Sequence, residues 1–106
     1  SNRSRRVVVY GAGPYGQLLV REMRANTDWN MNPVAFLDDD PMKVRKWIVG
    51  VPVRGGLADL ERTLAEYSVD EVILSSPLIN GQVEHRIREV CGVLDKRVRR
   101  LSMSIH

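Results

Sequence analysis

The chain has 106 residues, of which 43% are hydrophobic and 27% are charged, as expected for one globular domain with one core. Its single cysteine, Cys91, excludes an internal disulfide and a multi-cysteine metal site. The net charge of +3 does not indicate nucleic-acid binding, because aromatic residues are not interleaved with the basic ones. No apolar run approaches the ~20 residues of a membrane span. The chain starts at Ser1, without methionine, so we expect a piece of a longer protein.

The first predicted element is an apolar strand that runs into a glycine-rich turn. The unbroken run Val7–Tyr10 predicts a strand buried on both faces of a parallel sheet. The next six residues fit the pattern G-x-G-x-x-G: Gly11, Ala12, Gly13, Pro14, Tyr15 and Gly16. In this pattern the first glycine allows a tight turn, the second lets a pyrophosphate approach the backbone, and the third lets helix and strand pack closely. The alternative is a turn that only packs strand on helix.

A helix is predicted from Pro14 to Ala25, and its first N–H groups would face the phosphates of a ligand. A second strand, Val34 to Leu37, ends at Asp38, about 20 residues beyond the glycines, where a carboxylate binds the ribose of a nucleotide. We include Asp39 in the candidate site, although Asp39 or Asp40 is expected to cap a turn. No histidine accompanies these carboxylates with ligand spacing, so we predict no metal site.

The middle of the chain predicts a loop, an edge strand and a helix. The basic residues Lys43, Arg45 and Lys46 are expected to form a solvated face rather than a phosphate clamp. A short third strand is predicted near Val51–Val53, at the sheet edge because Pro52 lacks an N–H group. The apolar spacing over Leu57 to Tyr67 predicts the second helix.

The last third predicts a strand, a helix and a strand. A fourth strand lies within Asp70–Pro77 and ends in Ser75 and Ser76, whose hydroxyls either reach a phosphate or ribose or cap the strand end. A helix follows over Gln82 to Leu94, and a fifth strand over Val98 to Leu101.

This alternation predicts an α/β fold: a Rossmann-like, doubly wound, parallel five-stranded sheet in the order 3-2-1-4-5. The order reverses between the first and fourth strands, so the ligand crevice is expected between the glycine turn and Ser75–Ser76. Catalysis is not predicted, because no tyrosine is followed four residues later by lysine, and His85 is expected to face solvent.

Four stretches resemble the CoA-binding-type nucleotide-binding domain of membrane-anchored CapD-like polysaccharide-biosynthesis proteins. They are VVVYGAGPYG, AFLDDDPMKVRKWIVGVPVRGGLADL, VDEVILSSP and VCGVLDKRVRRL. The family includes bacterial nucleoside-diphosphate-sugar 4,6-dehydratases and epimerases. The resemblance implies that residues 1–106 form a single nucleotide-binding domain in which Gly11, Gly13, Gly16 and Asp38 contact the nucleotide. It also implies preceding membrane helices, a following catalytic domain, and a parent protein at the cytoplasmic face of the inner membrane.

Two functions follow as hypotheses. In the first, the domain binds NAD(H), or another adenine or uridine nucleotide or nucleotide-sugar, within a dehydratase or epimerase and is not catalytic alone. Asp38 would then repel the 2′-phosphate of NADP. In the second, the domain is a non-catalytic regulatory or assembly module of a lipid-carrier sugar-phosphate transferase. A homo-oligomer contact would then form at the edge near Val53 and Trp47. Neither hypothesis includes nucleic acid, and the membrane would be reached only through segments outside this sequence.

Overall fold

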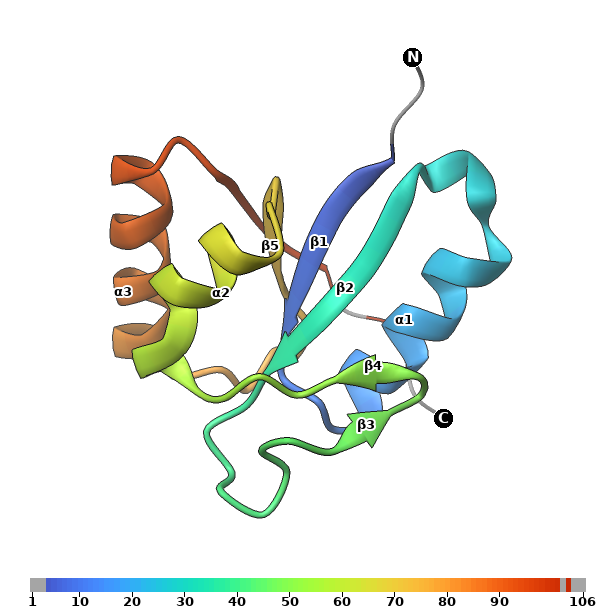
Figure 1. The fold of residues 1–106 in the computed structure, drawn as a ribbon, viewed down its shortest axis with the longest axis horizontal. Helices are drawn as coiled ribbons and strands as arrows, with labels where there is room; N and C mark the ends of the chain where they lie inside the picture. Colours follow the sequence, from blue (N-terminus) through green and yellow to red (C-terminus); the bar gives the residue numbers. More distant parts are fainter. Residues whose placement is uncertain (1–3, 102, 104–106) are drawn as a thin grey trace.

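A computed structural model describes residues 4–101 and 103 of the chain. Strands and helices alternate along it except for one short hairpin in the middle of the chain, as Figure 1 shows. In chain order the elements are β1 (Arg5–Tyr10), α1 (Pro14–Ala25), η1 (Thr27–Trp29), β2 (Met31–Leu37), β3 (Trp47–Ile48), β4 (Val51–Pro52), η2 (Leu57–Asp59), α2 (Leu60–Glu66), β5 (Glu71–Leu74), α3 (Gly81–Val93) and β6 (Arg97–Arg100).

The main sheet has four parallel strands in the order β2-β1-β5-β6. This arrangement confirms the predicted α/β class and the reversal of strand order beside β1. β2 begins earlier than predicted, at Met31, and takes in Pro33 where the register with β1 shifts between Val7 and Val8. A proline is tolerated in a strand at such an irregularity, because the ladder is already interrupted there.

The predicted third strand near Val51–Val53 forms only in part, so the main sheet has four strands rather than five. Val51 and Pro52 form β4, which pairs in an antiparallel hairpin with β3, and only Val53 bridges β2, at Phe36. The hairpin forms because Val49 and Gly50 both adopt positive φ (44° and 75°), as in the two-residue turns that favour antiparallel pairing.

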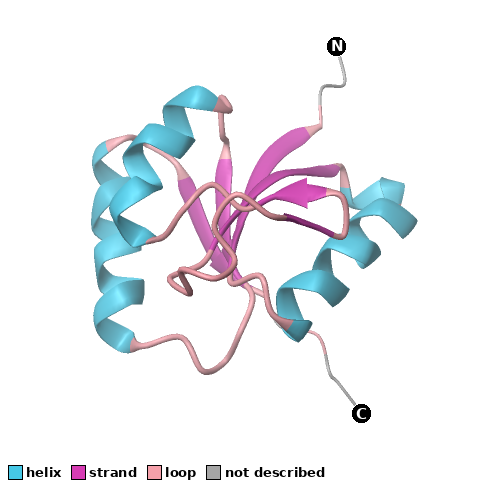
Figure 2. Ribbon diagram, turned by 60° about the horizontal axis from the view of Figure 1, so that its bottom comes forward, coloured by secondary structure: helices cyan, strands magenta, loops and turns pink. Residues whose placement is uncertain are grey.

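Helices cover both faces of the sheet, α1 on one face and α2 with α3 on the other (Figures 1 and 2). Alternate residues of β1 point to opposite faces, so Val7 and Val9 pack with Leu19 on the α1 side, while Val8 packs with Leu64 and other residues on the α2–α3 side. All five side chains are buried.

Cys91, on α3, is buried within this second layer. Burial raises the pKa of its thiol to about 11, so the sulfur stays protonated and unreactive at neutral pH. Within residues 4–101 and 103, no helix has the length and apolar character to cross a membrane.

Candidate functional site

A cavity of about 290 Å³ lies at the carboxyl edge of the sheet, where β1, β2 and β5 end. It is lined by Gly11, Gly13, Pro14, Tyr15, Gly16, Asp38, Lys43, Ser75, Ser76 and Leu78. The structure therefore brings together most of the predicted site residues from three separate stretches of sequence. This is the crevice expected where the strand order reverses.

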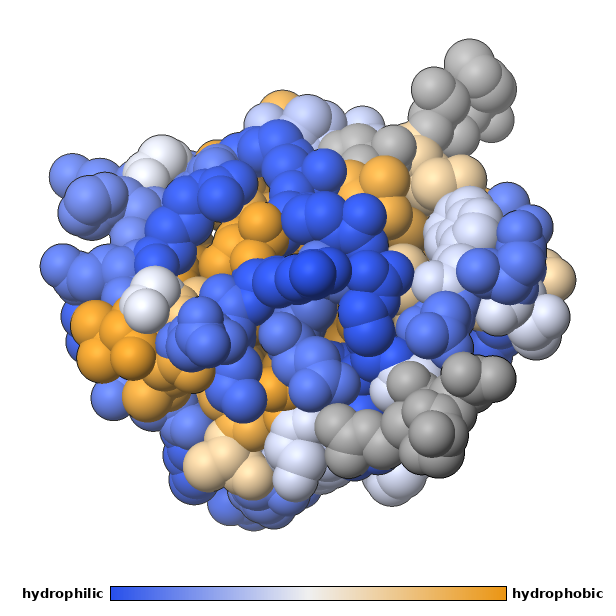
Figure 3. Space-filling model, turned by 90° about the horizontal axis from the view of Figure 1, so that it is seen from above, coloured by the Kyte–Doolittle hydropathy of each residue, from blue (hydrophilic) through white to orange (hydrophobic). Residues whose placement is uncertain are grey.

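A larger cavity, of about 440 Å³, lies near the opposite edge of the sheet, next to Asp70 and Lys96, which precede β5 and β6. It contains none of the predicted site residues. Figure 3 views the molecule from this amino-terminal edge and shows a mainly hydrophilic surface with smaller hydrophobic areas. The carboxyl edge is therefore the better candidate for a ligand site.

The three glycines of the turn have different physical roles. Gly11 has φ +104°, and a Cβ there would lie 2.8 Å from Ser75 Oγ. A Cβ on Gly16 would lie 1.9 Å from the Gly11 carbonyl oxygen, so only glycine lets α1 pack this closely. A Cβ on Gly13 would meet nothing closer than Lys43 Nζ, at 3.9 Å. Gly13 is thus the glycine that leaves room beside the backbone for a ligand.

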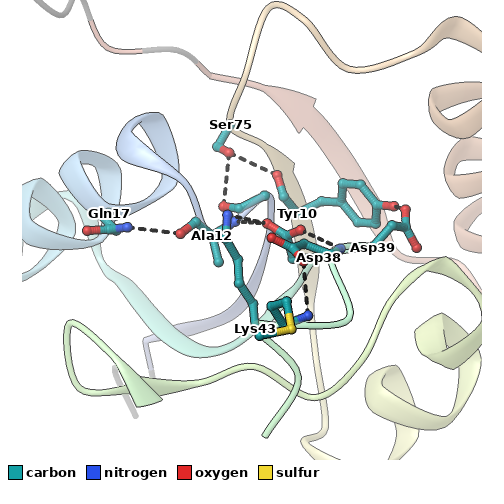
Figure 4. Close-up of polar contacts among 10 residues, drawn as sticks. Tyr10, Ala12, Gln17, Asp38, Asp39, Lys43 and Ser75 are labelled. Atoms are coloured by element: carbon teal, nitrogen blue, oxygen red, sulfur yellow. Dashed lines mark hydrogen bonds and ion pairs between the residues drawn. The ribbon is translucent and has the colours of Figure 1, made fainter. Parts of the chain in front are cut away.

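The amino end of α1 forms one wall of the cavity. Gly13 occupies the N-cap position and makes no side-chain hydrogen bond to the helix. Pro14 is the first helical residue, and the first turn carries no acidic residue. The positive end of the helix dipole is therefore not neutralised by a side chain of its own first turn. Gln17 Nε2 donates to the Ala12 carbonyl at 3.0 Å and steadies the turn (Figure 4).

Asp38 lies across the turn from α1. Its Oδ2 accepts the Ala12 N–H (2.8 Å), its Oδ1 accepts the Asp40 N–H (2.9 Å), and Lys43 Nζ lies 3.5 Å from Oδ2 (Figure 4). Burial by itself raises the pKa of the Asp38 carboxyl, but the two N–H groups and the ammonium outweigh it, and the pKa is lowered. The carboxylate is therefore ionised at neutral pH.

We expect Asp38→Asn to lower the stability of the domain at pH 7. A lowered folded-state pKa contributes stability above the unfolded value of about 3.9, and this is lost as pH falls through the folded value. The difference in melting temperature between wild type and Asp38→Asn should therefore shrink as the pH falls below about 4. Thermal unfolding across this range measures it, with the exposed Asp28→Asn as control; a constant difference would contradict the assignment.

Asp39, a predicted site residue, is not brought to the cavity. Its Oδ2 accepts the Tyr10 hydroxyl, and its Oδ1 accepts the Leu57 N–H at 2.9 Å. Burial and then the bond to Asp39 raise the pKa of the Tyr10 phenol. Asp39 thus ties the end of β1 to η2.

The two serines differ in their contacts. Ser75 is buried, and its Oγ donates to the Tyr10 carbonyl at 2.9 Å, so it holds the end of β5 against β1. Ser76 Oγ accepts the Leu78 N–H at 3.0 Å and lines the cavity. Of the two roles predicted for these serines, Ser75 has the one at the strand end, whereas Ser76 lies at the wall of the cavity.

Sequence reasoning missed Lys43. It was expected on a solvated face, but its side chain is only 32% exposed and its ammonium lies over the glycine turn. The turn opened by Asp40 and Pro41 brings it there, because the Lys43 N–H donates to the Asp40 carbonyl at 3.0 Å. The Asp40-Pro41 pair, which indicates a turn, was the feature of the sequence that could have predicted this position. Arg45 and Lys46 are exposed, as predicted.

The parallel sheet, the glycine turn and the acid that ends β2 define a Rossmann-like domain of the nucleotide-binding type. The chain belongs to the CoA-binding domain family, whose model matches residues 1–100. This confirms the resemblance seen in the sequence.

Relatives come from polysaccharide biosynthesis. The chain is 30% identical over 87 residues to the capsular polysaccharide biosynthesis protein CapD of Staphylococcus aureus, covering 81% of this chain and 14% of CapD. It is 34% identical over 74 residues to the probable polysaccharide biosynthesis protein EpsC of Bacillus subtilis (strain 168), covering 70% and 12%. The chain thus spans less than a sixth of either relative.

Solved structures show the same fold. UDP-D-quinovosamine 4-dehydrogenase from Vibrio fischeri matches with a TM-score of 0.78 and 27% identity, over 95% of this chain and 79% of that one. RSP, a Rex-family repressor, solved in complex with β-NADH, matches with a TM-score of 0.70 and 20% identity, over 97% and 48%. At that identity the RSP match concerns the fold alone.

Proposed function

We propose that this domain binds a nucleotide, NAD(H) or another adenine or uridine nucleotide, as part of a nucleoside-diphosphate-sugar dehydratase or epimerase. The observation that carries the proposal is the cavity at the carboxyl edge. There Gly13 leaves the backbone accessible, α1 presents its amino end, and Asp38 stands opposite. Similarity to CapD, EpsC and the quinovosamine enzyme supports the setting in polysaccharide biosynthesis.

The site would hold the ligand by its ribose and phosphates. Phosphate oxygens would accept N–H groups at the start of α1, where the helix dipole favours negative charge. A ribose hydroxyl would donate to Asp38, whose ionised carboxylate retains acceptor capacity beyond its bonds to Ala12 and Asp40. The same carboxylate would repel a 2′-phosphate, so NAD should bind better than NADP.

The domain would supply binding rather than chemistry. Tyr10 donates its hydroxyl to Asp39 and has a raised pKa, and the thiol of Cys91 is buried within the α2–α3 layer. Neither group can act as a base or nucleophile at the cavity. The reaction would belong to the rest of a longer, membrane-anchored protein facing the cytoplasm.

Calorimetry with NAD, NADP, coenzyme A and a UDP-sugar tests the proposal. We expect one or more of these to bind in the micromolar range, and NAD to bind better than NADP. Asp38→Ala should weaken NAD binding about 10-fold, which is the loss of roughly one charge-assisted hydrogen bond. Asp28→Ala, an exposed acid on η1, is the matched control. No binding of any of the four at millimolar concentration would overturn the proposal, and equal NAD binding by Asp38→Ala would overturn the role of that carboxylate.

A further inference from the structure

We propose that Lys43 contacts the phosphates of the ligand, and that the site therefore prefers nucleoside diphosphates to monophosphates and unphosphorylated nucleosides. This inference rests on the proposed nucleotide site and adds that the site distinguishes ligands by their number of phosphates. It starts from the position of one ammonium group.

Lys43 Nζ lies opposite the open backbone of the glycine turn. It is 3.9 Å from the point where a Cβ on Gly13 would stand, and 3.5 Å from Asp38 Oδ2 (Figure 4). A phosphate beside Gly13 would therefore lie close to both the amino end of α1 and the Lys43 ammonium. Ammonium groups bind phosphate as point charges, and helix N–H groups bind it directionally, so the two are complementary.

The backbone that carries Lys43 is fixed by hydrogen bonds. Besides its N–H bond to Asp40, its carbonyl accepts the Lys46 N–H at 3.1 Å. Arg45, two residues after Lys43, donates its N–H to the Val53 carbonyl at 2.9 Å, and Val53 itself bridges β2. The turn is thus anchored to the sheet, so less conformational entropy would be lost when Lys43 binds a phosphate.

Because of the charges of the site, the contribution of Lys43 to affinity should depend on the number of phosphates in the ligand. Asp38 is needed for a ribose hydroxyl, yet its negative charge repels the phosphates that follow. Lys43, 3.5 Å away, offsets that charge. Removing the ammonium would leave the carboxylate uncompensated, at a cost that rises with the charge of the ligand. The loss should therefore be largest for a diphosphate and absent for a nucleoside.

Calorimetry with adenosine, AMP and ADP, repeated with uridine, UMP and UDP, tests this on wild type, Lys43→Gln and Lys43→Arg. The control is Lys46→Gln, an exposed lysine of the same turn. For the base that binds better, Lys43→Gln should weaken diphosphate binding about 10-fold, monophosphate binding less, and nucleoside binding less than 2-fold, as expected for one charge-assisted contact. Lys43→Arg should keep the diphosphate preference, and Lys46→Gln should change diphosphate affinity less than 2-fold.

The outcomes separate this inference from the proposed function. Wild type that binds the diphosphate while Lys43→Gln binds it equally well would overturn the role of Lys43 and leave the nucleotide site standing. An equal loss for nucleoside, monophosphate and diphosphate would assign Lys43 to the structure of the turn and also overturn the inference. Wild type that binds NAD or a UDP-sugar but none of the six probes would overturn the inference alone, and wild type that binds neither the six probes nor the four ligands above would overturn both. A diphosphate preference that narrows as salt rises, in wild type but not in Lys43→Gln, would support the charge mechanism.

Discussion

Gly16→Ala is expected to lower the free energy of unfolding by about 3 kcal/mol or more, one of the largest single-residue effects in this domain. The new Cβ would lie 1.9 Å from the carbonyl oxygen of Gly11 and 3.2 Å from the ring of Phe36. The closest atom belongs to the backbone, so no side-chain rotation relieves the overlap, and α1 must move away from β1. Urea unfolding followed by circular dichroism measures the loss.

Gly92→Ala is the matched control for this prediction. Gly92 lies on α3, and a Cβ there would meet nothing within 4 Å. Because alanine favours a helix over glycine, this variant should unfold with unchanged free energy or with a gain of up to about 1 kcal/mol. If Gly16→Ala were as stable as wild type, the close packing of α1 on the glycine turn would be wrong, and with it the shape of the proposed phosphate site.

Arg99→Met is expected to destabilise the domain by about 2–3 kcal/mol, because it removes the main partner of a buried charge. Glu71 is fully buried at the start of β5. Arg99 Nε lies 2.7 Å from its Oε2, and Arg99 Nη2 lies 3.2 Å from its Oε1, while Arg5 Nη1 is farther away, at 4.0 Å. The arginine side chain is 47% exposed, so we expect less than the 3–5 kcal/mol typical of a fully buried pair.

A double variant tests this account of the Glu71–Arg99 pair. Replacing both residues, as Glu71→Met with Arg99→Met, should recover most of the lost stability, because no charge then remains buried. Arg97→Met, at an exposed position of the same strand, should change the free energy of unfolding by less than about 0.5 kcal/mol. A single Arg99→Met variant as stable as wild type would show that Arg5 or water compensates the Glu71 carboxylate.

The fold was largely predictable because its strands and helices are encoded locally. The apolar run of β1, the glycines and the periodicity of α1 each specify their own structure, and the carboxyl edge then follows from the handedness of parallel connections. The strand at Val51–Val53 was predicted only in part, because its pairing depends on a turn. The apolar run looks like a strand of the main sheet, but the positive φ at Val49 and Gly50 folds it back on β3.

The site was predictable where spacing along the chain determines position. Asp38 follows directly from a strand end, so its place beside the glycine turn could be read from the sequence. Lys43 could not, since its ammonium reaches the site only through the fold of the turn at 40–46. The pairing of Arg99 with Glu71 could not be predicted either, because it depends on the register of two parallel strands.

The turn that positions Lys43 also forms hydrogen bonds with Val53, next to β2. Val53 donates its N–H to the Lys46 carbonyl at 2.8 Å, and its carbonyl accepts the Arg45 N–H at 2.9 Å, so both main-chain groups of Val53 are satisfied. At Val53 itself, a neighbouring molecule therefore cannot extend the ladder by adding a strand. The homo-oligomer contact expected near Val53 and Trp47 would instead involve the outer strand of the hairpin, β3, and projecting side chains such as Trp47, which is 71% exposed.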